Sequence, residues 1–261
     1  IRRPTPDCWD DAIADRNAQA RGGLAAWRRV KSMALSGQLE AGRPRDPQKL
    51  AAAYQRPRPR GALRKALAPP AEVAAGAPVR LPFAMELQRP RRSRVEVRFR
   101  GQTAVQVYDG ERGWKLRPFL GRHEVEPFSA EELRVAAQQA DLDGPLLDWA
   151  AKGSRVALLG KEPVDGRDAF VLEVTPRRGP PRRVWVDAET YLDVRVDGTR
   201  RLDGRPRTTW TTFRDFRPVE GLLVPHQLET AVEGAPGSEK LTVERVALNP
   251  KLDAARFARP E

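Results

Sequence analysis

Few side chains in this sequence have the chemistry of a catalytic or metal site. The chain holds two histidines, His123 and His226, and one cysteine, Cys8. A structural zinc site usually needs four such ligands, and His123 lies in an expected loop with no partner nearby in sequence. The sequence has no Gly-x-Ser-x-Gly turn, no Walker loop and no Gly-x-Gly-x-x-Gly turn. We therefore expect a protein that is not an enzyme and that takes no cofactor and no metal.

His226 is the histidine with an informative setting. It lies in the segment Val224-Pro-His-Gln-Leu228. In a strand, alternate residues point to the same face, so His226 shares a face with Leu222, Val224, Leu228 and Val232. A histidine on an apolar face can contact a ligand headgroup, or it can be a hydrogen-bonded structural residue. The sequence leaves both interpretations open.

The N-terminal residues bear on the compartment. One cysteine cannot form an internal disulfide, so Cys8 does not indicate the redox environment. The chain begins at Ile1 and not at Met, which fits a removed export signal or a trimmed N-terminus. Lipid attachment at Cys8 would allow outer-membrane anchoring, although residues 1–7 are polar.

The net charge of +12 predicts attraction to anionic surfaces. A weak contact with acidic lipid is one expectation, and a basic protein that binds nucleic acid or another polyanion is the alternative. Four aromatic residues near arginines favour that alternative: Trp185, Tyr191, Trp210 and Phe213. No recognised nucleic-acid motif is present, so we expect no specific nucleic acid partner.

Regular apolar alternation begins at Arg80 and predicts an antiparallel meander with one face in water. Turn signals at Gly101 and Asp109-Gly110 separate the strands. We expect ten alternating residues to share one concave apolar face and to form a cavity wall: Phe83, Met85, Leu87, Val95, Val97, Phe99, Val105, Val107, Trp114 and Leu116. A concave apolar face must be filled by its own side chains, a lid or a ligand.

Helices are expected at the start and in the middle of the chain. Residues 9–29 indicate two short helices broken at Gly22-Gly23, and residues 129–151 indicate a helical lid. Ser129 followed by Glu132 is a capping box, and Gly144-Pro145 is expected to begin a second helix of the lid. Four residues are the expected lid contacts: Leu133, Leu146, Leu147 and Trp149.

Residues 41–79 are rich in Pro, Arg, Ala and Gly and predict an inserted loop, with one short helix over 47–54. Further strands are expected from Arg155 to Leu248, to a total of about twelve. The predicted fold class is β-rich α+β, a single domain over residues 1–261 with one curved antiparallel sheet. A sheet of 11–12 strands must curl or close.

Six phrases, taken in order, resemble the lipoprotein-carrier family of LolA and LolB. They are DRNAQARGGLAAWRRVKSMALSGQL, RVEVRFRGQTAVQVYDGERGWKLRPFLGR, SAEELRVAAQQADLDGPLLDW, RVWVDAETYLDVRVD, GLLVPHQLE and VERVALNPKLDAARFARP. The resemblance covers most of residues 10–260. It departs at residues 41–79, where the family has a short hairpin.

The resemblance implies an unclosed β-barrel whose open face is plugged by helices. It implies a carrier or binding protein that holds a lipid, acyl chain or lipoprotein in the periplasm or cell envelope of a Gram-negative bacterium. The partners would be the cargo and donor or acceptor proteins of the envelope, and we expect a monomer. Family members hold the lid with an arginine, which the sequence does not identify here.

Two other interpretations remain beside the carrier. The apolar face can be an ordinary packed core beneath the helices. The protein can also be a structural or sensor module with the same fold and no bulky ligand.

Overall fold

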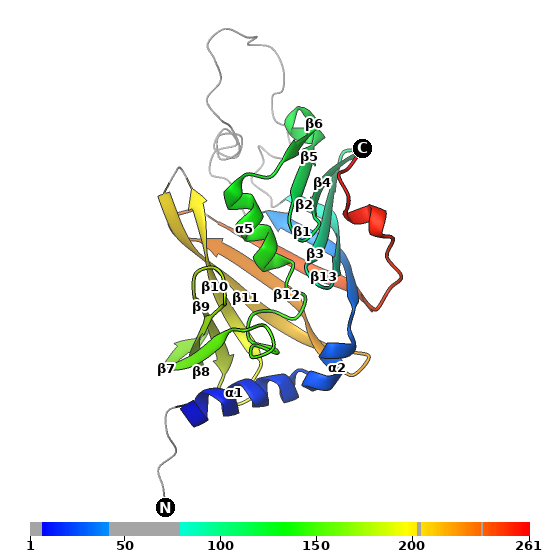
Figure 1. The fold of residues 1–261 in the computed structure, drawn as a ribbon. Coiled ribbons are helices and arrows are strands. Elements are labelled where there is room, and N and C mark those ends of the chain that lie inside the picture. The colour runs from blue at the N-terminus through cyan, green and yellow to red at the C-terminus, as the bar shows by residue number, and fades with distance from the viewer. Residues whose placement is uncertain (1–6, 42–78, 203–204, 236) are drawn as a thin grey trace, which may run out of the picture.

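The structure is a computed structural model that describes residues 7–41, 79–202, 205–235 and 237–261. Its described strands form one antiparallel sheet in the order β6-β5-β4-β3-β2-β1-β13-β12-β11-β10-β9-β8-β7 (Figure 1). The strands are β1 (Ser32–Ala41), β2 (Val79–Gln88), β3 (Arg92–Phe99), β4 (Gln102–Tyr108), β5 (Gly113–Arg117), β6 (Arg122–Pro127), β7 (Arg155–Val164), β8 (Arg167–Thr175), β9 (Arg182–Asp187), β10 (Asp193–Leu202), β11 (Arg205–Val219), β12 (Leu222–Val232) and β13 (Ser238–Leu248).

The predicted fold class is confirmed, with thirteen strands instead of 11–12. The sheet curves around one helix, and its edge strands β6 and β7 are not paired with each other (Figure 1). The strand missing from the prediction is β6, whose sequence RHEVEP has no apolar alternation. A half-wet strand is recognised by that alternation, so the pattern gave no signal there.

Two helices precede the sheet, as the sequence predicts. They are α1 (Asp7–Ala20) and α2 (Leu24–Arg29), and Gly22 and Gly23 separate them with φ of 107° and 93°. Positive φ is accessible to glycine at little cost, so the chain turns sharply at this pair. Among the described helices, none is long and apolar enough to cross a bilayer.

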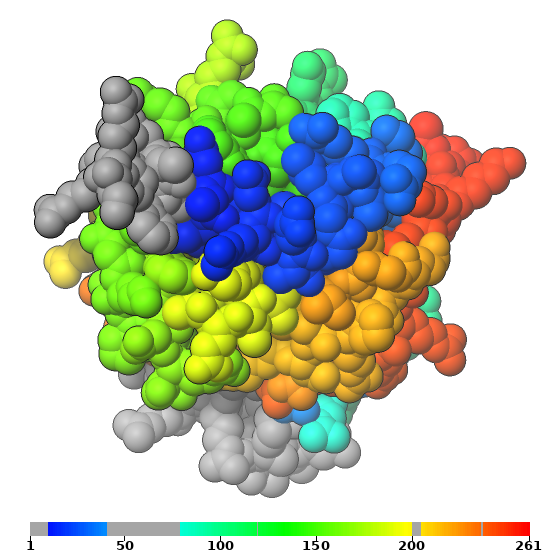
Figure 2. Space-filling view, turned by 90° about the horizontal axis from the view of Figure 1, so that it is seen from below, coloured from blue at the N-terminus to red at the C-terminus, as the bar shows by residue number. Residues whose placement is uncertain are grey.

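The two ends of the sheet differ in what covers them. We call the end where α1 and α2 lie the base end, and the opposite end, where the β3–β4 and β10–β11 turns lie, the mouth end (Figure 1). Seen from the base end, α1 and α2 lie across the strand ends beside the segments near residues 191 and 221 (Figure 2). Arg21 accepts a backbone bond from Leu223, and the Asn17 side chain donates to the Tyr191 carbonyl at 2.7 Å.

The chain between β6 and β7 begins with α5 (Ala130–Gln139), which has the predicted capping box of Ser129 and Glu132. The predicted second helix is wrong. Residues 142–152 form consecutive turns. Gly144 and Asp148 have φ of 81° and 56°, which a continuous right-handed helix does not permit. The insertion at residues 42–78, with its expected short helix, lies outside the described residues.

Candidate ligand-binding site on the concave face

The predicted cavity wall divides into two groups, and the first lies on the concave face. In antiparallel strands, directly paired residues point to the same side of the sheet. Phe83 pairs with Val97, and Met85 pairs with Val95. Leu87 packs in a buried cluster beneath the segment that follows α5. Six predicted residues therefore share the concave face: Phe83, Met85, Leu87, Val95, Val97 and Phe99.

The other four predicted residues lie on the convex face, so the expectation of one shared face is wrong. Val105 pairs with Glu96 and with Leu116, and Val107 pairs with Trp114. Because Glu96 follows Val95 in β3, this set points away from the concave face. The C-terminal 3-10 helix η2 (Ala254–Phe257) covers it: Phe257 and Leu252 pack on Val105, Val107, Trp114 and Leu116.

The concave wall continues across strands that were not part of the predicted site. Leu39 pairs with Leu81 and with Leu241, Leu241 pairs with Leu228, and this row ends at Phe213 in β11. The alternation of apolar residues in segments 31–40 and 222–232 could have identified these additional wall residues. The wall thus extends from β3 through β1 to β11.

Burial along this wall changes from the base end to the mouth end. At the base end, Met33, Leu87 and Leu222 are fully buried with Trp27 and Leu147. Toward the mouth end most of the apolar side chains of the wall are only partly buried: Leu35, Leu39, Met85, Val95, Val97, Phe99, Phe213, Leu228 and Leu241. The described residues therefore form a closed core at one end and an incompletely covered apolar wall at the other.

The helix α5 lies across the concave side and touches both flanks of the sheet, at β4–β5 and at β10 (Figure 1). Its residues Ala136 and Ala140 are buried against Tyr108, and Leu133 is partly buried in the same cluster. An ion pair between Glu132 and Lys115 of β5 adds one polar contact. Only small or partly buried side chains dock this helix.

The segment after α5 is packed more deeply. Leu146 is 2% exposed and lies among Leu172, Val184 and Ile13. Leu147 is 1% exposed and lies in the base-end cluster with Trp27. Trp149 is partly buried against the cluster of Leu146. These three of the four predicted lid residues belong to the core of the base end, whereas Leu133 lies on α5.

Buried charges fix this second segment to the sheet and to α1. Asp143 accepts hydrogen bonds from Arg89 and from Lys152, both at 2.6 Å. The Asp143 carbonyl accepts a bond from Arg21 at 2.9 Å, and Arg21 also pairs with Asp193 at 3.0 Å. Arg89 follows β2 and Arg21 follows α1, so these contacts join both elements to this segment. Arg21 and Arg89 therefore anchor the segment that follows α5.

The surroundings shift the pKa values of the two buried carboxylates, Asp143 and Asp193, in opposite directions. Burial raises the pKa of Asp143, but Lys152 and Arg89 outweigh it, so the pKa lies below its ordinary value. For Asp193 burial dominates, and its pKa is raised despite Arg21 and Asn17. Asp143 is therefore the carboxylate whose charge the surroundings stabilise.

The histidines have different surroundings. His226 is 5% exposed, and its Nδ1 donates to the carbonyl of Val224 at 2.9 Å. This bond within its own strand fits the structural interpretation, and its ring faces the same side as Val224 of the base-end cluster. The expectation that His123 lies in a loop is wrong, because it is exposed on β6. No group of three or more His, Cys, Asp or Glu residues in the described part of the chain is placed to hold a metal.

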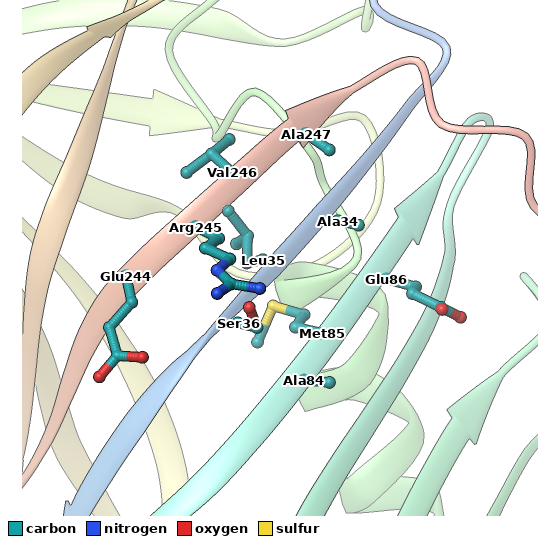
Figure 3. Close-up of a pocket in the computed structure, with 10 residues that line it drawn as sticks. All are labelled: Ala34, Leu35, Ser36, Ala84, Met85, Glu86, Glu244, Arg245, Val246 and Ala247. Atoms are coloured by element: carbon teal, nitrogen blue, oxygen red, sulfur yellow. The ribbon is translucent and has the colours of Figure 1, made fainter.

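A separate hollow of about 630 Å³ lies on the convex face, over β13, β1 and β2 (Figure 3). Its floor is made of small residues, Ala34, Ser36 and Ala84, and Glu86 and Arg245 stand at its rim (Figure 3). Ser36 pairs with Arg245 and with Ala84, so this floor faces away from the concave wall. The lining of the hollow also includes Leu35, Val246 and Met85, the last of which belongs to the predicted wall.

Comparison with known proteins places the fold. No protein-family model matches the sequence, and no curated protein matches it. Among solved structures, a LolA superfamily protein from Nitrosomonas europaea superposes with a TM-score of 0.58 at 14% identity, covering 95% of this chain and 97% of that one. An outer-membrane lipoprotein-sorting protein domain from Vibrio parahaemolyticus gives 0.54 at 14% identity, covering 94% of both chains.

A third solved structure extends the same group. A DUF1329 family protein from Desulfovibrio piger gives a TM-score of 0.58 at 15% identity and covers 98% of both chains. At such identities the likeness concerns the fold. The resemblance seen in the sequence is thus confirmed at the level of structure: the chain has the LolA-like fold of an unclosed, curved sheet.

Proposed function

We propose that this protein is a carrier or binding protein that holds an acyl chain, a lipid or the acyl part of a lipoprotein against its concave face. The observation that carries the proposal is the apolar wall at the mouth end, where Val97, Leu39 and Leu228 stay partly exposed on the concave face. Each methylene buried there contributes about 0.8 kcal/mol. The LolA-like fold, shared with a lipoprotein-sorting domain, supports the same function.

The weak docking of α5 sets the exchange properties of this site. A chain entering from the mouth end displaces contacts of Leu133 and Ala136, and leaves the base-end cluster in place. The net affinity should therefore be moderate, as a carrier requires. The proposal includes no catalytic step. It places the protein in the periplasm or cell envelope of a Gram-negative bacterium, as a monomer that exchanges cargo with envelope donors and acceptors.

The nucleic-acid alternative is disfavoured by where its aromatic residues lie. Trp185 and Trp210 hold the guanidinium of Arg195 between their rings, at 4.8 and 5.0 Å from the ring centroids. Tyr191 and Phe213 pack on the core cluster of the concave side. Bases stack on free aromatic faces, and these four residues offer no continuous platform.

The test is titration with a fluorescent fatty acid. Val97→Asp puts a charge on the apolar wall, so we expect the affinity to fall at least about tenfold, since an unpaired charge disfavours an apolar ligand. The matched control is Thr103→Asp, because Thr103 pairs with Arg98 and lies on the opposite face of the same two strands. We expect it to bind as the wild type does.

Equal effects of the two substitutions, or no binding by the folded wild type, would contradict the proposal. Mass spectrometry of lipid extracted from the purified protein distinguishes the carrier from a sensor module with an ordinary packed core. A co-purified acyl lipid is expected for the carrier.

A further inference from the structure

Three tight turns of this sheet share one geometry but differ in charge. Each has two central residues with positive φ: Arg100-Gly101, Asp165-Gly166 and Glu220-Gly221. Alternate connections of an antiparallel meander lie at opposite ends of the sheet. Arg100-Gly101, which joins β3 to β4, therefore lies at the mouth end, whereas the two acidic turns lie at the base end.

Further exposed residues add to this difference in charge between the two ends. The β8–β9 connection, at the mouth edge of the sheet, carries Arg177 and Arg178, and β11 begins there with Arg205. The base end carries Glu111 and Glu189 in its turns.

The separation of charge is a bias and not complete. At the mouth end Glu124, Glu233 and Glu239 are exposed, and Glu233 accepts a bond from the Thr208 backbone at 3.1 Å. At the base end several cations are exposed among the acidic residues: Arg29, Lys31, Arg91, Arg112, Arg167 and Arg217. Exposed Arg100, Arg177 and Arg178 lie in the described turns at the mouth end, whereas the turns at the base end mix acidic residues with Arg91 and Arg112.

Arg100 occupies a position that suits another residue type. Its φ of 50° is a left-handed conformation that favours Asn, Asp and Gly, and the equivalent base-end turn has Asp165. The guanidinium of Arg100 lies over the ring of Phe99, 5.4 Å from its centroid, beside exposed Arg98. Two cations thus stand next to an aromatic residue of the concave wall.

An exposed apolar residue accompanies these cations. Leu120, in the turn between β5 and β6, is 41% exposed and belongs to the 3-10 helix η1 (Pro118–Leu120), which contacts β4. The β5–β6 turn and the yellow β10–β11 hairpin lie at the same end of the molecule in Figure 1. Cations with an exposed leucine fit a lipid surface better than a nucleic acid, which would need free aromatic rings.

We propose that the mouth end docks on an anionic lipid surface through Arg98, Arg100 and Arg205, with the base end turned away from it. This inference rests on the proposed function. A carrier whose mouth end faces a membrane would let an acyl chain pass from the bilayer to the apolar wall without crossing water. Docking on the lipid surface does not require an acyl chain bound to the apolar wall.

The test is co-sedimentation of the full chain with vesicles of phosphatidylcholine, with and without phosphatidylglycerol. Wild type should bind the anionic vesicles preferentially, and added salt should weaken the binding. Each arginine near such a surface contributes roughly fivefold to partitioning. The variant Arg98→Gln/Arg100→Asn should therefore bind about 25-fold more weakly, and Asn suits the left-handed turn, so folding is preserved.

The matched control is Arg29→Gln/Arg112→Gln, which removes the same charge at the base end and should bind within about twofold of wild type. Equal losses in both variants, or no preference of wild type for anionic vesicles, would overturn the proposal. So would a mouth variant that loses retention on single-stranded DNA and keeps vesicle binding. If wild type binds vesicles but no fluorescent fatty acid, the proposed function fails while the docking stands.

Discussion

At the scale of single residues, Asp143 is a buried carboxylate that pairs with two cations. Its side chain is 2% exposed, and it pairs with Arg89, which is 28% exposed, and with Lys152, which is 16% exposed. The backbone carbonyl of the same residue accepts a bond from Arg21. A buried ion pair is weak evidence of net stability, but removing one partner leaves an uncompensated charge.

We therefore expect Asp143→Asn to lower the free energy of unfolding by about 3 kcal/mol, because Arg89 would lose the Asp143 carboxylate and Lys152 would keep only Asp141. Urea denaturation measures this. The control is Arg28→Gln, which breaks the well-aligned but exposed pair of Arg28 with Asp148 and should change stability far less. Similar losses in both variants would mean that Asp143 is not the anchor of the segment.

The pKa of Asp143 predicts how this contribution depends on pH. The folded pKa lies below the unfolded one, which is near ~4. The stabilisation is then fully present above the unfolded pKa and is lost as the pH falls through the folded pKa. The stability difference between wild type and Asp143→Asn should thus be constant from pH 7 to about pH 5 and shrink below pH 4. Denaturation curves across that range measure it, and a difference independent of pH would contradict it.

At the scale of elements, the segment that covers the concave face has two parts. The helix α5 docks through alanines and the partly buried Leu133, whereas residues 141–152 are held by ion pairs and by Leu146 and Leu147. We infer that α5 alone is the moving lid and that the second part is a fixed plug of the base end.

Truncation of one leucine in each part tests this inference. Leu147→Ala should cost about 3 kcal/mol of unfolding free energy, because the side chain is fully buried. Leu133→Ala should cost clearly less, since Leu133 is only partly buried, and should speed the release of a fluorescent fatty acid. Stopped-flow release and urea denaturation measure the two effects. Faster release in Leu147→Ala than in Leu133→Ala would contradict the assignment of the lid.

The sequence predicted most elements and the main feature of the site, but not the assignment of faces. The alternation from Arg80 to Leu116 identified the strands correctly. The error at Val105 and Val107 arose because the apolar side chains of β3 lie on the concave face, whereas Val105 and Val107 of β4 lie on the convex face under η2. The two-residue turn Arg100-Gly101 pairs Phe99 with Gln102, so odd residues of β3 oppose even residues of β4. Turn length therefore held the missing information.

Long-range contacts account for what the sequence could not predict. The turns of residues 142–152 are stabilised by Arg21 and Arg89, which are distant in sequence, so no local pattern identifies them. Likewise, Leu252 and Phe257 reveal the apolar convex cluster only once β4 and β5 are in place. Tertiary contacts determine both the turns of residues 142–152 and the convex apolar cluster, and the local periodicity of the sequence does not predict such contacts.

At the scale of the whole molecule, the described sheet gains its continuity from the pairing of β1 with both β2 and β13. These pairings join the β2–β6 flank to the β7–β13 flank and complete the concave wall. At the mouth end of β1, Ala41 pairs directly with Val79 of β2, and residues 42–78 connect the two. This register is the same as that across Arg100-Gly101, where Phe99 pairs with Gln102 around two residues.

We expect residues 42–78 to be dispensable for folding, because their two ends already meet in a hydrogen-bonded register. Replacing them with Asn-Gly gives the two-residue turn that a hairpin of this twist prefers. Shortening the connection lowers the entropy of the unfolded chain and should raise the free energy of unfolding by about 2 kcal/mol. Thermal denaturation should remain cooperative, with Tm unchanged or raised. The control is a flexible Gly/Ser link of the original length, which should melt as the wild type does. A loss of cooperative melting in the Asn-Gly variant alone would show that this segment contributes contacts that the β1–β2 pairing does not replace.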